Sequence, residues 1–228
     1  MKYFNFPIRM MQDILYSNEE KKKNFLSDVL YFAIYSHSLS IEDLNEYEET
    51  EVQRVKRSAS WFNVTVGSIG VAISTGASLV RTHESSKVYT GLNTNIFWDF
   101  YKGAKTDFEW ECLFAHLALK SILGKKEYVK TDNLMLYARM AGLELKKEYE
   151  KLKGFNFSRY HRDKIVSKLE MDWGLKYYSR YTRGFYCGYE VDIEKLIFIA
   201  ENNKEAIKKE FLKKQKAEIL KKFHDSRK

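Results

Sequence analysis

Apolar residues recur at every third or fourth position along most of the chain, and this spacing is typical of amphipathic helices. One proline and 11 glycines leave few positions at which such helices would be interrupted. In the N-terminal half a short strand is predicted at 87–93, where β-branched and aromatic side chains precede Gly91 and Asn93. Elsewhere the pattern predicts a mainly helical protein, with helices at about 7–16, 19–37, 51–62, 64–79, 107–123, 131–141, 145–153, 158–172 and 193–223.

The helix predicted at 158–172 is basic and lies in the sequence FNFSRYHRDKIVSKLEMDWG. Ser158 is a typical N-cap residue. The apolar side of this helix is expected to comprise Tyr160, Ile165, Val166, Leu169 and Trp173. The residues left largely outside that side are Arg159, Arg162, Asp163, Ser167 and Lys168. Arginine is informative here because its planar guanidinium can pair with guanine edges or phosphate oxygens in a two-point manner.

A β-hairpin is predicted directly after this helix, in LKYYSRYTRGFYCGYEVD. Two runs rich in Tyr and Phe meet at Thr182, Arg183 and Gly184, which is typical of a hairpin turn. Arg180 and Arg183 would lie at its tip, where they could reach phosphate groups or the minor groove of a duplex. The aromatic side chains of the hairpin are interpreted as sheet packing, namely Tyr177, Tyr178, Phe185 and Tyr189.

The sequence RYHRDKIVSKLEMDWGLKYYSRYTRGFYCGYEVDIEKL resembles the recognition helix and wing of winged helix DNA-binding proteins, such as bacterial regulators and the replication initiators of plasmids and phages. The resemblance implies a mainly α fold with a small β-hairpin wing, with the winged helix-turn-helix in the C-terminal half. It departs from the usual pattern in LELKKEYEKLKGFN, which is longer than the turn that normally precedes the recognition helix. Either this segment contains an additional helix, or KKEYEKLKG is the reading helix and the contacts move to Lys146, Lys147 and Lys151.

A second helix-turn-helix is predicted upstream, because SASWFNVTVGSIGVAISTGASL resembles that motif as well. Ala59 would permit close helix crossing, and Asn63 would occupy a left-handed turn between Phe62 and Val64. The exposed residues of its reading helix would be Thr65, Ser68 and Arg81. The alternative is that the glycines at 67, 70 and 76 allow tight packing against another element.

Three domains are expected. Residues 1–104 form a helical domain with this motif at 51–80, and residues 105–192 form the winged helix. Residues 193–228 form a Lys-rich helix that packs on the body, pairs with a second copy or contacts DNA.

The charge distribution favours an anionic partner. The net charge is +8, and residues 151–184 contain nine basic and three acidic side chains, whereas residues 1–50 contain five basic and nine acidic ones. Neither cysteine lies in a CxxC motif, and no His/Cys cluster suggests a zinc site, which fits a reducing compartment. The uncharged stretch 58–80 contains too many glycines and hydroxyl side chains for a membrane span.

Enzymatic chemistry is not predicted. The five histidines are scattered, His116 is interpreted as a core residue, and a phosphate-binding GxxxxGK[ST] motif is absent. Glu109 and Glu111 could hold magnesium in a nuclease, but acids on adjacent helical positions are usually solvated. We therefore expect no cofactor and no metal.

The sequence thus predicts a cytoplasmic, sequence-specific protein that binds double-stranded DNA, with a homodimer as an open alternative and no membrane partner. It would act as a transcription regulator or as a replication initiator of a phage or mobile element. The alternative is a viral structural or assembly protein that uses the same fold for protein contacts. The predicted DNA-binding residues are Arg159, Arg162, Lys164, Ser167, Lys168, Arg180, Arg183, Lys130, Thr65, Ser68 and Arg81.

Overall fold

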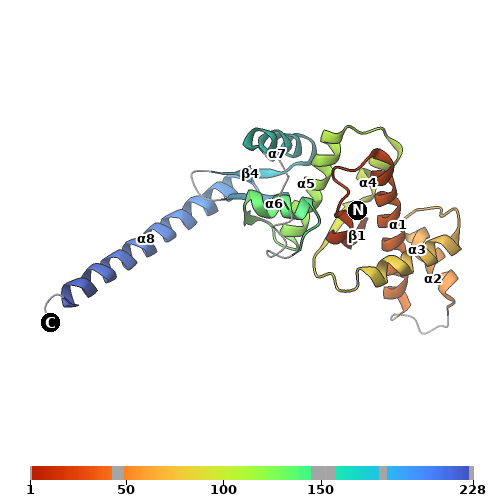
Figure 1. The fold of residues 1–228 in the computed structure, drawn as a ribbon, viewed down its shortest axis with the longest axis horizontal. Coiled ribbons are helices and arrows are strands. Elements are labelled where there is room, and N and C mark those ends of the chain that lie inside the picture. Colours follow the sequence, from red (N-terminus) through yellow and green to blue (C-terminus); the bar gives the residue numbers. More distant parts are fainter. Residues whose placement is uncertain (1, 43–48, 145–151, 153–157, 180–183, 226–228) are drawn as a thin grey trace.

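The computed structural model describes residues 2–42, 49–144, 152, 158–179 and 184–225, and at 207 and 220–225 it describes the backbone only. In these residues the chain is mainly helical with small antiparallel sheets, which confirms the mainly helical class (Figure 1). None of the described helices has both the length and the apolar character that crossing a lipid bilayer would require.

The N-terminus forms a strand. β1 (Tyr3–Pro7) pairs in antiparallel orientation with β2 (Tyr89–Asn93), and a 3-10 helix, η1 (Ile8–Met11), follows β1. Phe4 and Phe6 are fully buried, whereas Tyr3 and Asn5, which alternate with them along the strand, are exposed. The helix predicted at 7–16 is therefore wrong, because a burial period of two and backbone pairing with β2 determine the conformation of this segment.

Three helices follow in the N-terminal half, and the first packs against the other two. They are α1 (Glu19–Glu42), α2 (Glu51–Trp61) and α3 (Ile69–Thr82). After β2, the aromatic-rich α4 (Thr94–Lys102) buries Phe97 and Phe100. The strand predicted at 87–93 and the helix predicted at 51–62 are confirmed.

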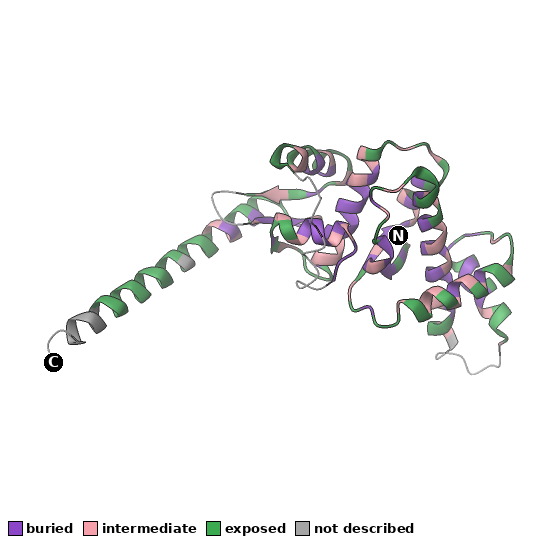
Figure 2. Ribbon diagram, in the orientation of Figure 1, coloured by how far each residue is buried: buried purple, intermediate pink, exposed green. Residues whose placement is uncertain are grey.

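The central helix α5 (Asp107–Leu123) connects the two halves of the molecule, because it contacts β2 on one side and α6 and α7 on the other. Its first turn is closed by a capping box, in which the hydroxyl of Thr106 accepts from the backbone N–H of Glu109 and the Glu109 carboxylate accepts from the backbone N–H of Thr106. Gly124, with φ +56°, ends it. Most of its residues are buried (Figure 2), and the boundaries predicted from sequence are confirmed.

A three-stranded antiparallel sheet and two helices pack against α5, the sheet through β3. In chain order they are β3 (Val129–Thr131), α6 (Asn133–Met140), α7 (Arg159–Trp173), β4 (Lys176–Tyr178) and β5 (Phe185–Gly188). The strand order is β3-β5-β4, so β5 lies in the middle. Strand β3 was not predicted, and α6 begins at Asn133 with Asp132 as its N-cap, whereas the sequence predicted a helix from about 131. The helix predicted at 145–153 lies outside the described residues apart from Leu152.

One hydrophobic cluster of buried residues extends from Phe4 in β1 to Cys187 in β5. It includes residues on both sides of the domain boundary predicted near 102–107, among them Phe100 in α4 and Trp110 in α5, whose ring centroids are 5.1 Å apart. The predicted domain boundary at residue 104 stays a prediction.

The last helix, α8 (Ile193–Asp225), extends away from the rest of the molecule (Figure 1). Its beginning packs on the body, where Leu196 and Ala200 are buried with Val191 and Tyr186. From Asn202 to Ile219 every side chain that the structure describes is exposed (Figure 2).

Candidate nucleic-acid interface

Helix α7 is held at both ends and along one side. The hydroxyl of Ser158 accepts from the backbone N–H of His161 at 3.2 Å, which caps the N-terminus as predicted. Gly174, with φ +69°, is the left-handed C-cap. Nε2 of His161 lies 2.7 Å from Oε2 of Glu111, so an additional polar contact ties α7 to α5.

The exposed side of α7 contains both basic and apolar groups. The side chain of Arg159 is 87% exposed, and Tyr160 is 70% exposed. Nζ of Lys164 lies 4.6 Å from the centroid of the Tyr160 ring, and Ser167 is exposed on the same helix. The prediction that Tyr160 lies on the apolar side is wrong. The opposite side of the helix contains the buried residues, which are Ile165, Val166 and Leu169.

Arg162 faces inward. Its side chain is 12% exposed, Nη1 donates to Oδ1 of Asn133 in α6 at 3.1 Å, and Nε donates to Oδ1 of Asp163 at 2.9 Å. The expectation that Arg162 lies on the exposed side is wrong, since it precedes Ile165 and Val166 by three and four positions and so shares their face. Its guanidinium connects α7 to α6.

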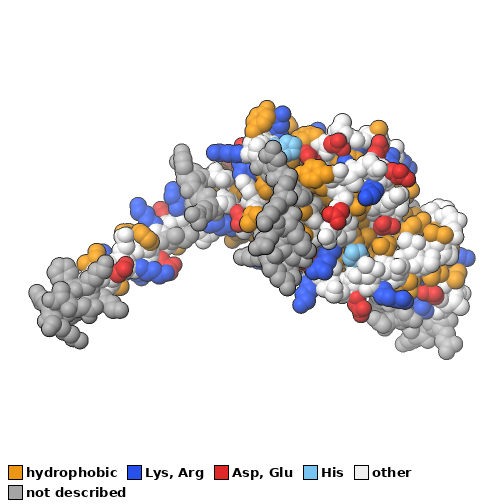
Figure 3. Space-filling view, in the orientation of Figure 1, with side chains coloured by type: hydrophobic (Ala, Val, Ile, Leu, Met, Phe, Trp, Pro, Cys, Tyr) orange, Lys and Arg blue, Asp and Glu red, His pale blue; other side chains and the backbone are white. Residues whose placement is uncertain are grey.

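Acidic residues accompany the basic ones on α7. Nζ of Lys168 lies 2.7 Å from Oδ2 of Asp172, and Nε of Arg159 lies 3.9 Å from Oδ2 of Asp163. Figure 3 accordingly shows basic, acidic and apolar side chains close together over α7, at the top of the view. Exposed ion pairs of this kind contribute little to stability. Their basic members can therefore exchange partners at small free-energy cost.

The strands after α7 form the sheet expected of the hairpin. Tyr177 and Phe185 pack with ring centroids 5.0 Å apart, and Oη of Tyr178 donates to Oε1 of Glu201 at 2.7 Å, which confirms that the hairpin aromatics pack within the fold. Lys176 in β4 is exposed and was not among the predicted contacts. Because β4 begins three residues after the end of α7, the sequence could have indicated that Lys176 lies near this helix.

Of the other basic residues predicted to contact DNA in this half, one is described by the structure and two are not. Lys130 lies in β3, on the opposite edge of the sheet from β4, with Nζ 5.5 Å from the ring centroid of Tyr186. Arg180 and Arg183 lie outside the described residues. The alternative reading helix, with Lys146, Lys147 and Lys151, lies outside them as well.

The upstream motif is reproduced only in part. Asn63 has φ +58°, and Ala59, Phe62 and Val64 are buried, as expected. However, α2 ends at Trp61 and α3 begins at 69, so the connection comprises residues 62–68, whereas a typical helix-turn-helix has about 3–4 residues there.

The predicted contact residues of the upstream motif are dispersed. The hydroxyl of Ser68 caps α3 by accepting from the backbone N–H of Val71 at 3.4 Å, and Thr65 is exposed just before it. Arg81 lies in the last turn of the same helix, about 20 Å from Ser68 at 1.5 Å per residue. These three side chains do not form one cluster.

The residues considered for metal or catalytic chemistry have structural roles. Glu109 is part of the capping box, and Glu111 contacts His161. Nδ1 of His116 lies 2.7 Å from Oη of Tyr189, and burial together with the charge of Lys120 lowers the pKa of His116 to about 3. His116 is therefore a neutral core residue, as predicted. Within the described residues no cluster of His, Cys, Asp and Glu could hold a metal ion.

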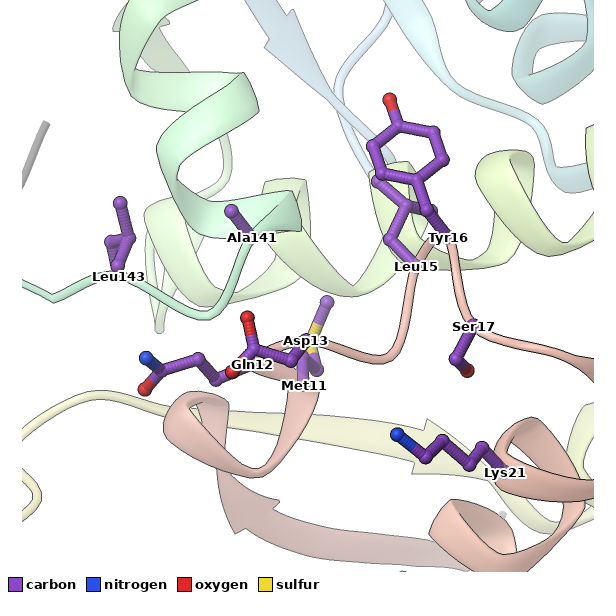
Figure 4. A pocket seen from close by; sticks show the side chains of 9 residues that line it. All are labelled: Met11, Gln12, Asp13, Leu15, Tyr16, Ser17, Lys21, Ala141 and Leu143. Atoms are coloured by element: carbon purple, nitrogen blue, oxygen red, sulfur yellow. The ribbon is translucent and has the colours of Figure 1, made fainter. Parts of the chain in front are cut away.

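A pocket of about 430 Å³ lies apart from α7, between the segment after η1 and the end of α6 (Figure 4). Ala141 and Leu143 lie on one side of it and Lys21 on the other, with Met11 and Asp13 between them. A pocket of this size fits a small molecule and not a duplex.

Comparisons with protein-family models, with curated proteins and with solved structures gave no match to this chain.

Proposed function

We propose that this protein binds double-stranded DNA, with α7 as the helix that enters the major groove and the β4–β5 hairpin as the wing beside it. The observation that supports this most is the order of elements, in which three helices, α5, α6 and α7, precede a hairpin that pairs with β3. A winged helix would have this order of elements, with a third helix that has one packed and one exposed side. The major groove is wide enough to admit such a helix.

The exposed side of α7 provides suitable groups for this role. Arg159 and Lys164 can pair with base edges or phosphates, and the hydroxyl of Ser167 can donate or accept. Lys168 and Lys176 would contact phosphates at the other end of the helix. Arg162 acts as a positioning residue, because its bonds to Asn133 and Asp163 orient α7 relative to α6.

The acidic neighbours imply a modest electrostatic contribution. Binding to DNA would replace the contacts of Arg159 with Asp163 and of Lys168 with Asp172 by contacts with phosphates. Specificity would then depend on α7, while affinity would depend on the few phosphate contacts and would fall with salt. A regulator or a replication initiator of a phage or mobile element, acting in the cytoplasm without enzymatic activity, has these properties.

The test is fluorescence anisotropy with labelled duplexes selected from a random pool, at several salt concentrations. Arg159→Ala and Lys164→Ala should each weaken duplex binding, and the slope of log affinity against log salt should become shallower by about 1 for each phosphate-binding side chain removed. Lys21→Ala, an exposed lysine of α1, is the matched control and should behave as wild type. A flat salt response, or equal binding by all three variants, would refute the proposal.

The exposed apolar residues of α8 favour one alternative, a viral structural or assembly role or a homodimer. Phe198, Phe211, Leu212 and Ile219 are all exposed. Large exposed apolar side chains on a long helix are typical of protein contact surfaces. Size-exclusion chromatography with light scattering, with and without duplex, distinguishes the two functions, since assembly beyond a dimer in the absence of DNA favours the structural role.

A further inference from the structure

A second surface with tyrosine and lysine side chains lies on the β1–β2 sheet and continues to the end of α5. On the outer face of the sheet, Tyr3 is 36% exposed and Tyr89 is 47% exposed, with exposed Asn5 between them. Nζ of Lys120 in α5 lies 5.9 Å from the centroid of the Tyr3 ring and 4.8 Å from that of Tyr189. The ammonium group of Lys120 thus lies beside the Tyr3 ring, and Asn5 separates Tyr3 from Tyr89 along the sheet.

The strand pairing determines the spacing of the rings. Tyr3 lies opposite Asn93 and Tyr89 lies opposite Pro7, so the two tyrosines are four ladder positions apart, or about 14 Å at 3.4 Å per residue. Gly91 lies opposite Asn5, and a Cβ there would approach Oδ1 of Asn5 to 2.8 Å. The glycine therefore leaves room for the side chains of Asn5 and Tyr3, since Cδ1 of Tyr3 would also lie 3.6 Å from that Cβ.

A hollow of about 350 Å³ at the C-terminal end of α5 continues this surface. Lys120, Lys125 and Lys126 line it together with Glu127 and Glu190. Nζ of Lys195 lies 2.7 Å and 2.8 Å from the two carboxylate oxygens of Glu127, which neutralises one of the two acids. The hollow thus has an excess of positive charge.

The framework beneath the surface is rigid. Phe4 and Phe6, on the inner face of β1, are fully buried, and the Phe4 ring packs 4.8 Å from Phe97 and 5.0 Å from Phe62. The hydroxyl of Thr90, on the inner face of β2, donates to the carbonyl of Leu117 at 2.7 Å and so attaches the sheet to α5. Rings held on such a framework lose little conformational entropy on binding.

We propose that this surface, formed by Tyr3, Asn5, Tyr89, Lys120, Lys125 and Lys126, binds single-stranded nucleic acid. Unpaired bases stack on the two tyrosines, the amide of Asn5 contacts a base edge, and the lysines bind phosphates. Exposed rings beside a group of cations are what a single strand requires, whereas the bases of a duplex stack on one another and are not accessible to such rings. The separation of the rings calls for a strand of several nucleotides and not for a free nucleotide.

This inference goes beyond the proposed duplex binding, because none of its residues belongs to α7 or the β4–β5 hairpin. The test is anisotropy with labelled oligothymidylate and oligouridylate, which also compares DNA with RNA. Tyr3→Ala/Tyr89→Ala should weaken binding by about tenfold or more. Tyr3→Phe/Tyr89→Phe should bind nearly as wild type, since stacking needs the ring and not the hydroxyl.

A lysine variant tests the phosphate contacts separately and is expected to fold, because its positions lie at the surface. Lys120→Ala/Lys125→Ala/Lys126→Ala should bind more weakly and with a shallower salt dependence. The matched control, Phe198→Ala/Lys209→Ala, removes an exposed ring and an exposed lysine from α8 and should bind as wild type.

The two binding proposals fail separately. Arg159→Ala should weaken duplex binding and leave oligothymidylate binding unchanged, and Tyr3→Ala/Tyr89→Ala should do the reverse. Absence of binding to both oligonucleotides overturns the inference. So does wild-type affinity in the lysine variant, or equal loss in the Phe and Ala variants when circular dichroism shows both to be folded.

Discussion

Gly76→Ala is a direct test of whether the glycines of α3 serve packing or contact with DNA. A Cβ at residue 76 would overlap the Cβ of Tyr35 and lie 2.9 Å from the carbonyl oxygen of Tyr31, both in α1. Gly70, in the same helix, has open space around it, and the nearest atom to a Cβ there is Oγ of Ser68 at 3.9 Å. The two glycines therefore form a matched pair.

The expected changes in the free energy of unfolding have opposite signs. Alanine in place of glycine stabilises a helix interior by up to about 1 kcal/mol. At 76 the overlap with α1 costs about 1–3 kcal/mol or more, because the neighbouring atoms belong to a backbone and to a Cβ that cannot rotate away. Gly76→Ala should thus be destabilised, whereas Gly70→Ala should be slightly stabilised because position 70 has no such neighbour.

Urea unfolding followed by circular dichroism measures both variants, with an expected slope of about 1–3 kcal/mol per molar for a protein of this class. The midpoint for Gly76→Ala should fall and that for Gly70→Ala should stay or rise. If Gly76→Ala is as stable as wild type and loses duplex binding instead, the packing argument fails and α3 regains its role as a reading helix.

Three further predictions concern the core and a helix cap. The pKa of His116 is lowered to about 3, so below about pH 6.5 the unfolded chain binds more protons than the folded protein. The free energy of unfolding should therefore fall by up to about 1.4 kcal/mol per pH unit from about pH 6.5 toward pH 3. Melting temperatures measured over this pH range should fall less steeply in His116→Gln. Burial raises the pKa of Cys112 and Cys187 to about 12, so both thiols should resist a thiol reagent at neutral pH until the protein is unfolded; reaction of the native protein would contradict this. Thr106→Ala removes one half of a capping box and should lower stability by about 1 kcal/mol in urea unfolding, with Thr82→Ala, at the exposed end of α3, as the control.

Elements whose signals are local were predicted well. The start of α5 depends on Thr106 and Glu109, three residues apart, and its end on Gly124, so both can be read within one turn. The N-cap of α7 at Ser158 is of the same kind. Such signals involve hydrogen bonds between near neighbours in sequence, and they do not depend on the rest of the fold.

Elements that depend on distant partners were missed. Pro7 suits the first turn of a helix, but it ends a strand here because β2, more than 80 residues later, pairs with β1. β3 is only three residues long and exists through its pairing with β5. Short runs of this kind have no distinctive pattern of their own, since tertiary contacts decide their conformation.

The candidate sites show the same division. Arg159 is exposed as the first residue of α7, and Arg162 could have been placed correctly by counting three and four positions to Ile165 and Val166. The neighbourhood of Tyr3, Tyr89 and Lys120 could not be derived from sequence, because it requires the register of β1 with β2 and the docking of that sheet on α5.

The attachment of α8 has a mechanical consequence. The helix is anchored to the sheet of the hairpin through Leu196 and Ala200, and its part from Asn202 to Asp225 would extend about 36 Å at 1.5 Å per residue. The helix is thus a long rigid arm that is attached at β4 and β5. A rotation of a few degrees at the sheet would displace the far end by several ångströms, so a partner bound there would be moved whenever the β4–β5 hairpin moves.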